Sequence, residues 1–465
     1  MKVTQVAICP TPASDAAGRP ALTPELLAAS GARYSRNNEG LDSILSKIDP
    51  NNLDKSVDGI FRMIDYGHQS IADMAPVAMF MDGLSLWLAY HIWTLCPTAG
   101  GQESSTRYIN YASVNELDAA SFGIPSELHE QWNNAMRQAF AAYETALEYW
   151  TQIAAAQPEL TRIPRSLLED ESEKAQKQVA RMKRNYAFDR ARNFLPAVAP
   201  TNVMMVMSAR GWVNLARQLR SHALPEAQRL GALIAEEIQL AAPRLIKHAT
   251  ANESTQKGLN ADFADWQAQA QAALDSDLGD HPSTAFLEVY PPRNSNESLF
   301  ADDLKFHENR YAHIGETVKR TAVRFGWDAV ALAEIRDLNR HRTGTKYCPL
   351  VPRGFYAALD QLPDEQSQPA LHLKELAQAG IEASNHARQL LADGDASFVY
   401  WTLLGTQYFF EHTTTADKFI YEAELRTGTG AHYRYAQHLH DTLQLWFEKY
   451  PQTRGLISEG CAEPE

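Results

Sequence analysis

Two long, predominantly apolar runs dominate the hydrophobic pattern of this chain. They cover residues 77–96 and 323–338, and each leads directly into a short polar segment, 100–108 and 340–346. Continuous apolar runs of this length are typical of buried helices. We therefore expect a buried helix over each run, with polar side chains presented where the helix ends.

Periodic spacing of apolar side chains predicts further helices between and after these runs. Trp132 and Tyr143 belong to one such face, and the helix that follows it is strongly charged until it turns apolar near residue 194. Short apolar or β-branched segments that stop at prolines, 2–9 and 284–290, predict strands. The predicted helices cover 128–157, 169–192, 202–240 and 413–446.

The order of predicted elements repeats along the chain. In each half a strand ends at prolines, an apolar helix follows, and a charged loop comes next. Between the halves lies a polar, Ala- and Gln-rich stretch with an Asp-rich end. We interpret this as an internal duplication in a helix-rich α+β fold, with a first copy at 1–245, a linker at 246–283 and a shorter second copy at 284–465.

Composition narrows the class of protein. The chain has 465 residues, of which 45% are hydrophobic and 22% charged, as in ordinary globular proteins of two or three domains. Its net charge of -14 argues against a nucleic-acid partner, so an anionic ligand must be held by a local group of arginines. The four cysteines are far apart, which fits a reduced compartment and neither disulfides nor a zinc site.

The run at 77–96 is about as long as a membrane span, but it contains Asp82, Gly83 and His91. A buried helix is the better interpretation, and no membrane partner is expected. Residues 1–15 lack the basic start and apolar run of a signal peptide. We therefore expect a cytoplasmic protein.

Candidate chemistry lies first in the polar segment Gly101–Tyr108. In an extended backbone Glu103, Ser105 and Arg107 project on one side. A hydroxyl and a guanidinium together suit a phosphate, whereas a carboxylate suits a ring nitrogen, an amide or a sugar hydroxyl. On these eight residues alone, a solvated loop is the simpler interpretation.

The second candidate is Arg340-His341-Arg342, at the end of the second apolar run. Two arginines beside a histidine at a helix end form a concentrated anion site, although most Arg-rich loops are solvated surface. His438 and His440 are two apart near a helix, so they point to different faces and do not indicate a metal site. No glycine-rich dinucleotide fingerprint follows a strand.

Together these stretches resemble the flavin-dependent thymidylate synthases. That family's signature is Arg-His-Arg, a short spacer, and Glu-x-Ser-x-Arg-Tyr, preceded by a Gly-His-x-Ser turn and an apolar helix. The first half matches it with Gly67-His68-Gln69-Ser70, the run 77–96 and Glu103–Tyr108, and it has Ala191-Arg192 in a later family position. It departs where Leu95-Cys96-Pro97 stands in place of Arg-His-Arg.

The second half shows the opposite loss. Its Arg-His-Arg is intact, but Cys348, Leu350 and Pro352 occupy the places of the Glu, Ser and Arg. Glu424-Leu425-Arg426, followed by Ala431-His432-Tyr433, resembles the family's closing segment. Each half therefore keeps the residues that the other half lacks.

The resemblance gives this pattern a physical explanation, because in the family the active site lies between subunits of a symmetric tetramer. A fused pair of copies needs only one of its two pseudo-equivalent sites. We expect one composite site per chain, and a homodimer that supplies four copies. The first copy would contribute Glu103, Ser105, Arg107 and Arg192, and the second Arg340, His341, Arg342 and Arg426.

The resemblance also implies the reaction: dUMP becomes dTMP with FAD as cofactor and with NADPH and methylenetetrahydrofolate as co-substrates. Arg426 would be catalytic and would stabilise negative charge on the pyrimidine. The residues implied in substrate binding are Glu103, Ser105, Arg107, Arg192 and Arg340. Those implied in FAD binding are Arg340, His341, Arg342, Ser70, Arg210 and Asn214, and no metal is implied.

Two other functions stay open. The loss of half of each motif would also suit a non-catalytic protein that binds flavin or nucleotide. The same fold and FAD would also suit an enzyme that acts on a different nucleoside substrate. The preferred nucleotide, the use of folate and the state of the second pseudo-site are not decided by these residues.

Overall fold

The computed structural model folds into two compact units, which are described separately. Unit 1 comprises Met1–Ser104, Ala120–Gly123 and Pro200–Phe263, and unit 2 comprises Ser105–Ala119, Ile124–Ala199 and Ala264–Glu465. The structure describes residues 1–36, 40–49, 52–65, 69–106, 109, 111, 117–293, 299–428 and 430–460.

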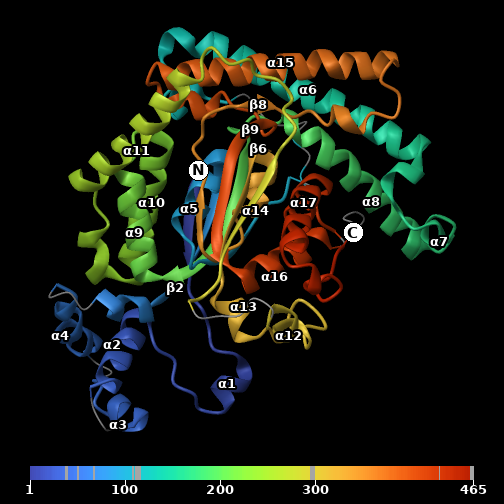
Figure 1. Ribbon diagram of the computed structural model, residues 1–465. Helices are drawn as coiled ribbons and strands as arrows, with labels where there is room; N and C mark the ends of the chain where they lie inside the picture. The colour runs from blue at the N-terminus through green and yellow to red at the C-terminus, as the bar shows by residue number, and fades with distance from the viewer. Residues whose placement is uncertain are drawn as a thin grey trace. The chain divides into compact units, whose positions relative to one another are not determined.

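An antiparallel sheet forms the centre of unit 1 (Figure 1). Its order is β1-β2-β4-β3, and β2 pairs with β4 from Pro76↔Ser208 to Ser85↔Pro200. A register shift between Asp82 and Leu84 coincides with Gly83, whose positive φ of 73° suits glycine. The strands are β1 (Lys2–Val6), β2 (Pro76–Ser85), β3 (Gly100–Glu103) and β4 (Pro200–Ser208).

The helix predicted over 77–96 is wrong in its first half. Residues 76–85 form β2, and only Leu86–Leu95 form a helix, α5, which Ser85 caps by accepting a hydrogen bond from the Leu88 N–H at 2.9 Å. A central strand that is buried along most of its length gives a nearly continuous apolar run, which periodicity cannot distinguish from a buried helix. The helical block predicted at 202–240 likewise begins with a strand, β4.

Helices α5, α9 and α10 pack on the first sheet, and the other α-helices that lie wholly in unit 1 come before β2 in the chain. Helix α2 begins at Pro24, and Thr23 caps it, because the Thr23 hydroxyl accepts from the Leu26 N–H at 3.4 Å. Glu226 is buried and accepts from both the N–H and the hydroxyl of Ser85 at 2.8 Å, which ties α10 to the start of α5. The helices are α1 (Pro12–Ala16), α2 (Pro24–Tyr34), α3 (Leu41–Ser46), α4 (Leu53–Asp65), α9 (Ala209–Arg220) and α10 (Pro225–Ala241).

Unit 2 contains a second antiparallel sheet with the order β5-β6-β9-β7, and β8 also pairs with β9. Its central pair, β6 and β9, shifts register between Trp327 and Val330, as the first sheet does in its own central pair. Both sheets thus repeat one topology and one succession of elements, and the predicted α+β fold of two fused copies is confirmed. The strands are β5 (Ala285–Tyr290), β6 (Ala322–Ala331), β7 (Thr345–Tyr347), β8 (Gly354–Phe355) and β9 (Thr406–Thr415).

Long helices complete unit 2. The helices predicted at 128–157 and 169–192 are confirmed as α6 (His129–Ala156) and α8 (Glu173–Ala191), which pack against each other. The helix predicted at 413–446 is wrong as one element: β9 ends at Thr415, and two helices follow. The run 323–338 again divides into a strand, β6, and a helix, α14. The other helices are α7 (Arg165–Leu168), α12 (Phe300–Leu304), α13 (Glu316–Arg320), α14 (Leu332–Leu338), α15 (Gln368–Ala392), α16 (Ala416–Thr427) and α17 (Tyr433–Lys449).

Residues 124–199 of the first half belong to unit 2, where they contact the second half directly. The Trp132 indole donates to the Tyr400 carbonyl at 3.0 Å, and the Gly405 N–H donates to the Asn193 carbonyl at 2.7 Å. Much of the predicted linker is helical, as α11 (Glu253–Ala272), which crosses the boundary between the units. The copy boundaries at 245 and 284 remain a prediction.

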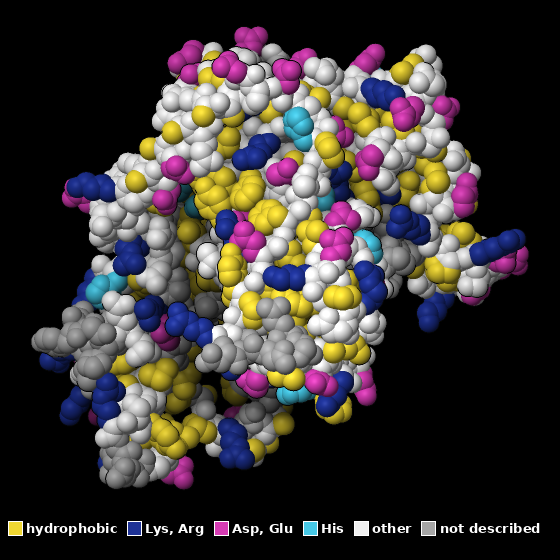
Figure 2. Space-filling view, viewed as in Figure 1, with side chains coloured by type: hydrophobic (Ala, Val, Ile, Leu, Met, Phe, Trp, Pro, Cys, Tyr) yellow, Lys and Arg dark blue, Asp and Glu magenta, His cyan; other side chains and the backbone are white. Residues whose placement is uncertain are grey.

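Basic and acidic side chains are interspersed on the face shown in Figure 2. Among the described residues, no helix combines the length and the apolar character that crossing a membrane requires.

Candidate functional site

Arg192 lies where α8 ends in unit 2, and its side chain is only 2% exposed. One terminal nitrogen donates to the Thr106 hydroxyl at 3.3 Å, and the other lies 3.2 Å from Asp337 Oδ2. A buried guanidinium needs a counter-charge, since an isolated charge in the interior is strongly unfavourable. An arginine of the first half is thereby paired with a carboxylate of the second half.

Asp337 bridges more than one arginine. It lies in α14, and its side chain is 10% exposed. Its other carboxylate oxygen accepts from an Arg340 terminal nitrogen, and its carbonyl accepts from Arg426 Nη2 at 3.1 Å. Arg192, Arg340 and Arg426, which we call the arginine cluster, therefore converge on one residue.

Arg426, on α16, is held by a histidine as well as by Asp337. Its Nε donates to His341 Nε2 at 2.6 Å, and its guanidinium lies 5.3 Å from the Tyr435 ring. Burial lowers the pKa of His341 to about 3; the positive charge of Arg426 acts in the same direction, and Glu422 opposes it. The imidazole is therefore neutral at neutral pH, with its proton on Nδ1, because Nε2 accepts from Arg426.

Glu422 supports His341 from the other side. Its carboxylate is 1% exposed and lies 3.9 Å from His341 Nδ1 and 3.1 Å from His412 Nδ1. Burial raises the pKa of Glu422, but the facing His341 and His412 rings more than offset this and lower it to about 2. His412 Nε2 in turn donates to the Thr343 carbonyl at 2.6 Å, which fixes the loop after Arg-His-Arg. This second layer holds His341 in one orientation.

The arginine cluster carries more positive than negative charge. Three arginines face one carboxylate, Asp337, and His341 is neutral, so a formal charge of plus two remains among these groups. A nucleotide phosphate near neutral pH is a dianion and could balance it. Guanidinium groups bind phosphate oxygens through planar pairs of N–H donors.

The other predicted substrate residues are placed only in part. Glu103 ends β3 in unit 1, and Ser105 belongs to unit 2, next to the Thr106 that bonds Arg192. The structure brings Arg192, Arg340, His341 and Arg426 together in unit 2, while Arg342 is exposed in the loop after them. Four motif residues lie outside the described part of the chain: Gly67, His68, Arg107 and Tyr108.

Three predicted FAD residues lie in unit 1. Ser70 is exposed in the short helix Gln69–Met74, and Arg210 and Asn214 project from α9 into a pocket of about 80 Å³. Arg210 pairs with Asp73 at 2.9 Å, and Arg217 donates to Asn214 Oδ1 at 3.0 Å.

This pocket fits an acceptor-rich anion such as a cofactor phosphate. The buried Nε of Arg217, which lines it, has no hydrogen-bond partner among the described residues, and Arg210 lines the same pocket. A buried donor without an acceptor is unfavourable, and an anionic oxygen would satisfy it. The residues present are therefore compatible with one phosphate group of FAD, and a pocket of about 80 Å³ is too small to hold the whole cofactor.

Sequence reasoning missed Asp337, Thr106 and Tyr435, which organise the arginine cluster. Only Asp337 had a usable signal, because a carboxylate inside a predominantly apolar helix needs a partner. Thr106 and Tyr435 are ordinary residues in their segments, and only the fold shows that they contact Arg192 and Arg426. Among the described residues, no group of three or more potential metal ligands is present.

Comparison with known proteins identifies the class. Residues 21–244 match the family described as thymidylate synthase complementing protein. The predicted resemblance to the flavin-dependent thymidylate synthases is thereby confirmed for this part of the chain, which is just under half of it.

Two individual proteins that resemble this chain share little sequence identity with it. The chain is 25% identical over 235 residues to the UPF0159 protein Ta1429 of Thermoplasma acidophilum, which covers 47% of each protein; the chain thus spans about half the length of this curated relative. A crystal structure of a UMP/dUMP methylase, PolB from Streptomyces cacaoi, bound with 5-Br dUMP, matches with 15% identity and a TM-score of 0.33. That match covers 53% of this chain and 93% of the other.

Proposed function

We propose that this protein is an FAD-dependent enzyme that methylates C5 of a pyrimidine nucleotide, with dUMP as the first candidate. Methylenetetrahydrofolate would be the carbon donor and NADPH the reductant. The observation that carries the proposal is the meeting of Arg192 from the first half with Arg340 and Arg426 from the second, through Asp337. The family match of residues 21–244 supports the same class of reaction.

Nucleotide binding would rest on the excess positive charge of the cluster. Arg192 is rigid, because it is buried and held at both terminal nitrogens, whereas the Arg340 side chain is 32% exposed. Arg340 can therefore turn towards a phosphate more easily than Arg192. Glu103, Ser105 and Arg107 are proposed to complete this binding site.

Arg426 would stabilise negative charge that develops on the pyrimidine during attack from C5. Three of the five N–H donors of a guanidinium are committed here, to His341, the Asp337 carbonyl and the Tyr435 hydroxyl at 3.5 Å. Two donors are left for N3 and the neighbouring oxygen of the base. Because its position is fixed before substrate binds, the arginine needs little reorganisation in the transition state.

Bound FAD, once reduced by NADPH, would supply the hydride that completes the methyl group. Ser70, Arg210 and Asn214 are proposed to bind it, together with Arg340, His341 and Arg342. A neutral His341 accepts from Arg426 and leaves the positive charge on the arginine, so it can orient this group without adding charge of its own. The protein thus positions the cofactor and adjusts the electrostatics around it.

We further propose that the chain arose by tandem duplication and that a homodimer provides the family's four copies. The matching strand orders of the two sheets support the duplication. One active composite site per chain would explain why each half keeps a different part of the motif.

The test is tritium release from C5-labelled dUMP by purified protein supplied with FAD, NADPH and methylenetetrahydrofolate. Release with formation of dTMP is the expected result. Label retained in dUMP, dCMP and UMP alike, with the flavin bound, would favour a non-catalytic binding protein instead. Turnover of another pyrimidine nucleotide while dUMP stays inert would change the substrate but keep the reaction class.

A further inference from the structure

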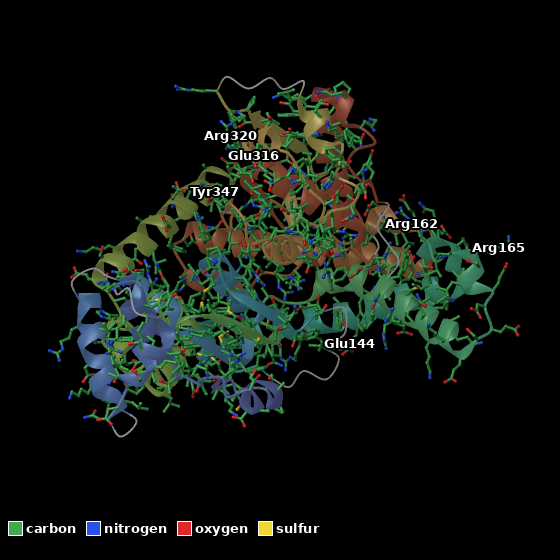
Figure 3. All side chains as sticks on the ribbon, turned by 90° about the horizontal axis from the view of Figure 1, so that it is seen from below. Glu144, Arg162, Arg165, Glu316, Arg320 and Tyr347 are labelled. Atoms are coloured by element: carbon green, nitrogen blue, oxygen red, sulfur yellow. The ribbon has the colours of Figure 1, made fainter. Side chains whose placement is uncertain are left out.

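A cavity in unit 2 is separate from the arginine cluster. Its volume is about 670 Å³, and none of the three cluster arginines lines it. Its walls come from the first turns of α17, the segments 280–283 and 360–361, and Arg162, which is labelled in Figure 3. This volume is within the range of small-molecule sites.

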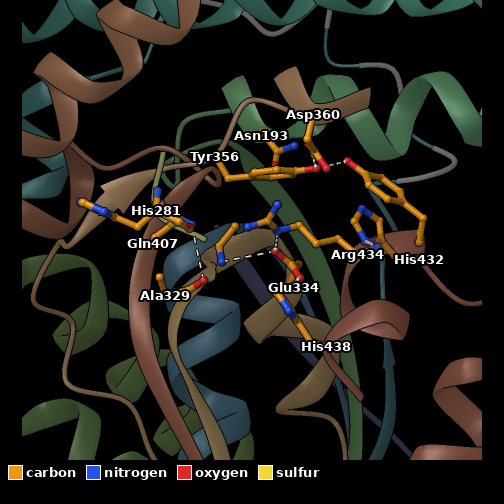
Figure 4. Close-up of polar contacts among 12 residues, drawn as sticks. Asn193, His281, Ala329, Glu334, Tyr356, Asp360, Gln407, His432, Arg434 and His438 are labelled. Atoms are coloured by element: carbon orange, nitrogen blue, oxygen red, sulfur yellow. Dashed lines mark hydrogen bonds and ion pairs between the residues drawn. The ribbon is translucent and has the colours of Figure 1, made fainter. Parts of the chain in front are cut away.

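Arg434 is the fixed cation of this cavity. Its side chain is 12% exposed, its Nε lies 3.2 Å from Glu334 Oε1, and its guanidinium lies 3.3 Å from the centre of the Tyr356 ring. Figure 4 shows Arg434 between the Tyr356 ring and Glu334. Because Nε faces Glu334, the two terminal nitrogens of Arg434 lie over Tyr356 with no carboxylate or carbonyl partner among the described residues, so they can donate to a ligand in the cavity.

The groups that hold Arg434 are themselves held. Glu334 is fully buried; it accepts from the Ala331 N–H at 3.3 Å and lies 3.0 Å from His438 Nε2. The Tyr356 hydroxyl is 2.8 Å from both the Tyr433 hydroxyl and Asp360 Oδ1. The guanidinium therefore keeps one position and orientation, as a recognition group requires.

The remaining charges of the cavity are mostly negative. Arg162 and Arg434 are opposed by three lining carboxylates, Asp280, Asp360 and Asp441, and by Glu334 behind Arg434, which leaves a formal charge of minus two. A phosphate dianion would be repelled here, in contrast to the arginine cluster. A ligand that carries one negative and one positive charge would not be repelled.

We propose that this cavity binds a small zwitterion of the amino-acid class. Its carboxylate would pair with the terminal nitrogens of Arg434, and its ammonium group would lie among the carboxylates of Asp280 and Asp441. The Ser283 hydroxyl, a buried group on the cavity wall without a hydrogen-bond partner among the described residues, is available to the ligand as well. This site goes beyond the proposed methylation and does not depend on it.

Binding is tested on the full-length protein with the standard L-amino acids, each alone, by saturation-transfer NMR followed by calorimetry. At least one should bind, and its N-acetyl and carboxamide derivatives should bind about tenfold more weakly or worse, because each lacks one charge. If no amino acid binds, or if the derivatives bind as well as the parent, the proposal is wrong.

Variants locate the ligand. Arg434→Lys keeps a positive charge beside Glu334 but loses the planar fork, so affinity for the amino acid should fall about tenfold, while dUMP affinity is unchanged. Arg454→Lys is the matched control, since Arg454 is half-exposed, pairs with Glu459 and does not line the cavity. Loss of dUMP binding in Arg434→Lys, with amino-acid binding retained, would overturn the assignment.

A second variant keeps the proposal testable if the Arg434→Lys protein does not fold. Asp280→Asn combined with Asp441→Asn changes only lining groups that are at least partly accessible. This double variant should bind the zwitterion more weakly, and its affinity for the N-acetyl derivative should not change. Equal effects on both compounds would contradict the placement of the ammonium group.

Discussion

Helices α5 and α14 occupy the same place in the two halves, directly after the second strand of each sheet, yet they are built differently. In α5 the third residue is Leu88, and the helix is uncharged and mostly buried. In α14 the third residue is Glu334, and Asp337 follows it by three positions; both are buried. One helix is a hydrophobic core element, and the other carries charges that need partners.

This difference shows how two copies of one fold can come to hold different charged groups. An apolar helix needs only neighbouring side chains that fill the space around it, and many combinations of side chains can do this. A buried carboxylate needs a particular cation at hydrogen-bond distance, and α14 finds Arg192 for Asp337 and Arg434 for Glu334. The charged helix therefore determines where the arginines gather, and the apolar helix does not.

The largest effect is expected at Arg426. Arg426→Lys should reduce kcat by about 100-fold or more, because it removes the planar donors proposed to face the base, while the charge remains. Steady-state kinetics of dTMP formation measures it. Arg454→Lys should retain the parent rate, and an Arg426→Lys variant with normal kcat would place the catalytic charge elsewhere.

The third residues of the two helices provide a direct comparison of stability. Glu334→Gln should cost about 3 kcal/mol at neutral pH, because Arg434 and His438 lose their buried counter-charge. Leu88→Ala should cost about 2–5 kcal/mol through the cavity it leaves. Urea unfolding of both variants measures these costs.

The pH dependence of these costs distinguishes the loss of a buried charge in Glu334→Gln from the loss of packing in Leu88→Ala. Burial raises the pKa of Glu334, but His438 and Arg434 more than offset this and lower it. Stability that comes from a lowered carboxyl pKa is present above about pH 4.3, the unfolded value, and is lost as the pH falls further. The cost of Glu334→Gln should therefore shrink in acid, whereas the cost of Leu88→Ala should not; a pH-independent cost for both would refute the electrostatic account.

Two histidines, His91 in α5 and His341 just after α14, should have a smaller effect on stability, separable from that of Glu334. Burial lowers the pKa of His91 to about 3, with a further contribution from His222, and burial also lowers that of His341 to about 3. Both must charge on acidification, so the free energy of unfolding should fall as the pH drops from about 6.5 towards 3.

Replacing each histidine distinguishes a purely structural role from a role in turnover. His91→Phe should reduce the acid sensitivity and leave kcat and KM unchanged, because His91 stacks on Trp87 with ring centres 5.2 Å apart. His341→Phe should reduce the acid sensitivity as well but also impair turnover, because Arg426 loses its acceptor. Unimpaired turnover in His341→Phe would argue against the cluster as the active site.

The smallest effect is expected at Cys96, which stands where the family has Arg-His-Arg. Burial raises the pKa of its thiol to about 12, so it is protonated and unreactive at neutral pH. Cys96→Ala should cost about 1 kcal/mol and leave dTMP formation unchanged. Rapid inactivation by a thiol reagent that Cys96→Ala abolishes would assign this helix end a role in the reaction.

Sequence patterns predicted much of the fold where periodicity was clear. The long amphipathic helix α6 was found to within one residue at each end, because one face is buried and the other solvated, whereas the start of α8 was placed four residues too early. Strands β2 and β6 were missed, because a buried central strand and a buried helix share the same apolar pattern. Their division into strand and helix depends on pairing with β4 and β9, which lie far away in the chain.

The amino-acid sequence determined which ionisable groups this protein has for its proposed chemistry: Arg192 in the first half, and Arg340, His341 and Arg426 in the second. It also determined that neither half has a complete set. Only the tertiary structure decided which carboxylate each arginine meets, because a buried ion pair depends on a separation of a few ångströms between elements more than a hundred residues apart. Asp337 and Glu334 look alike as acidic residues of one short helix, but the fold pairs Asp337 with the arginine cluster and Glu334 with Arg434, which lines a separate cavity.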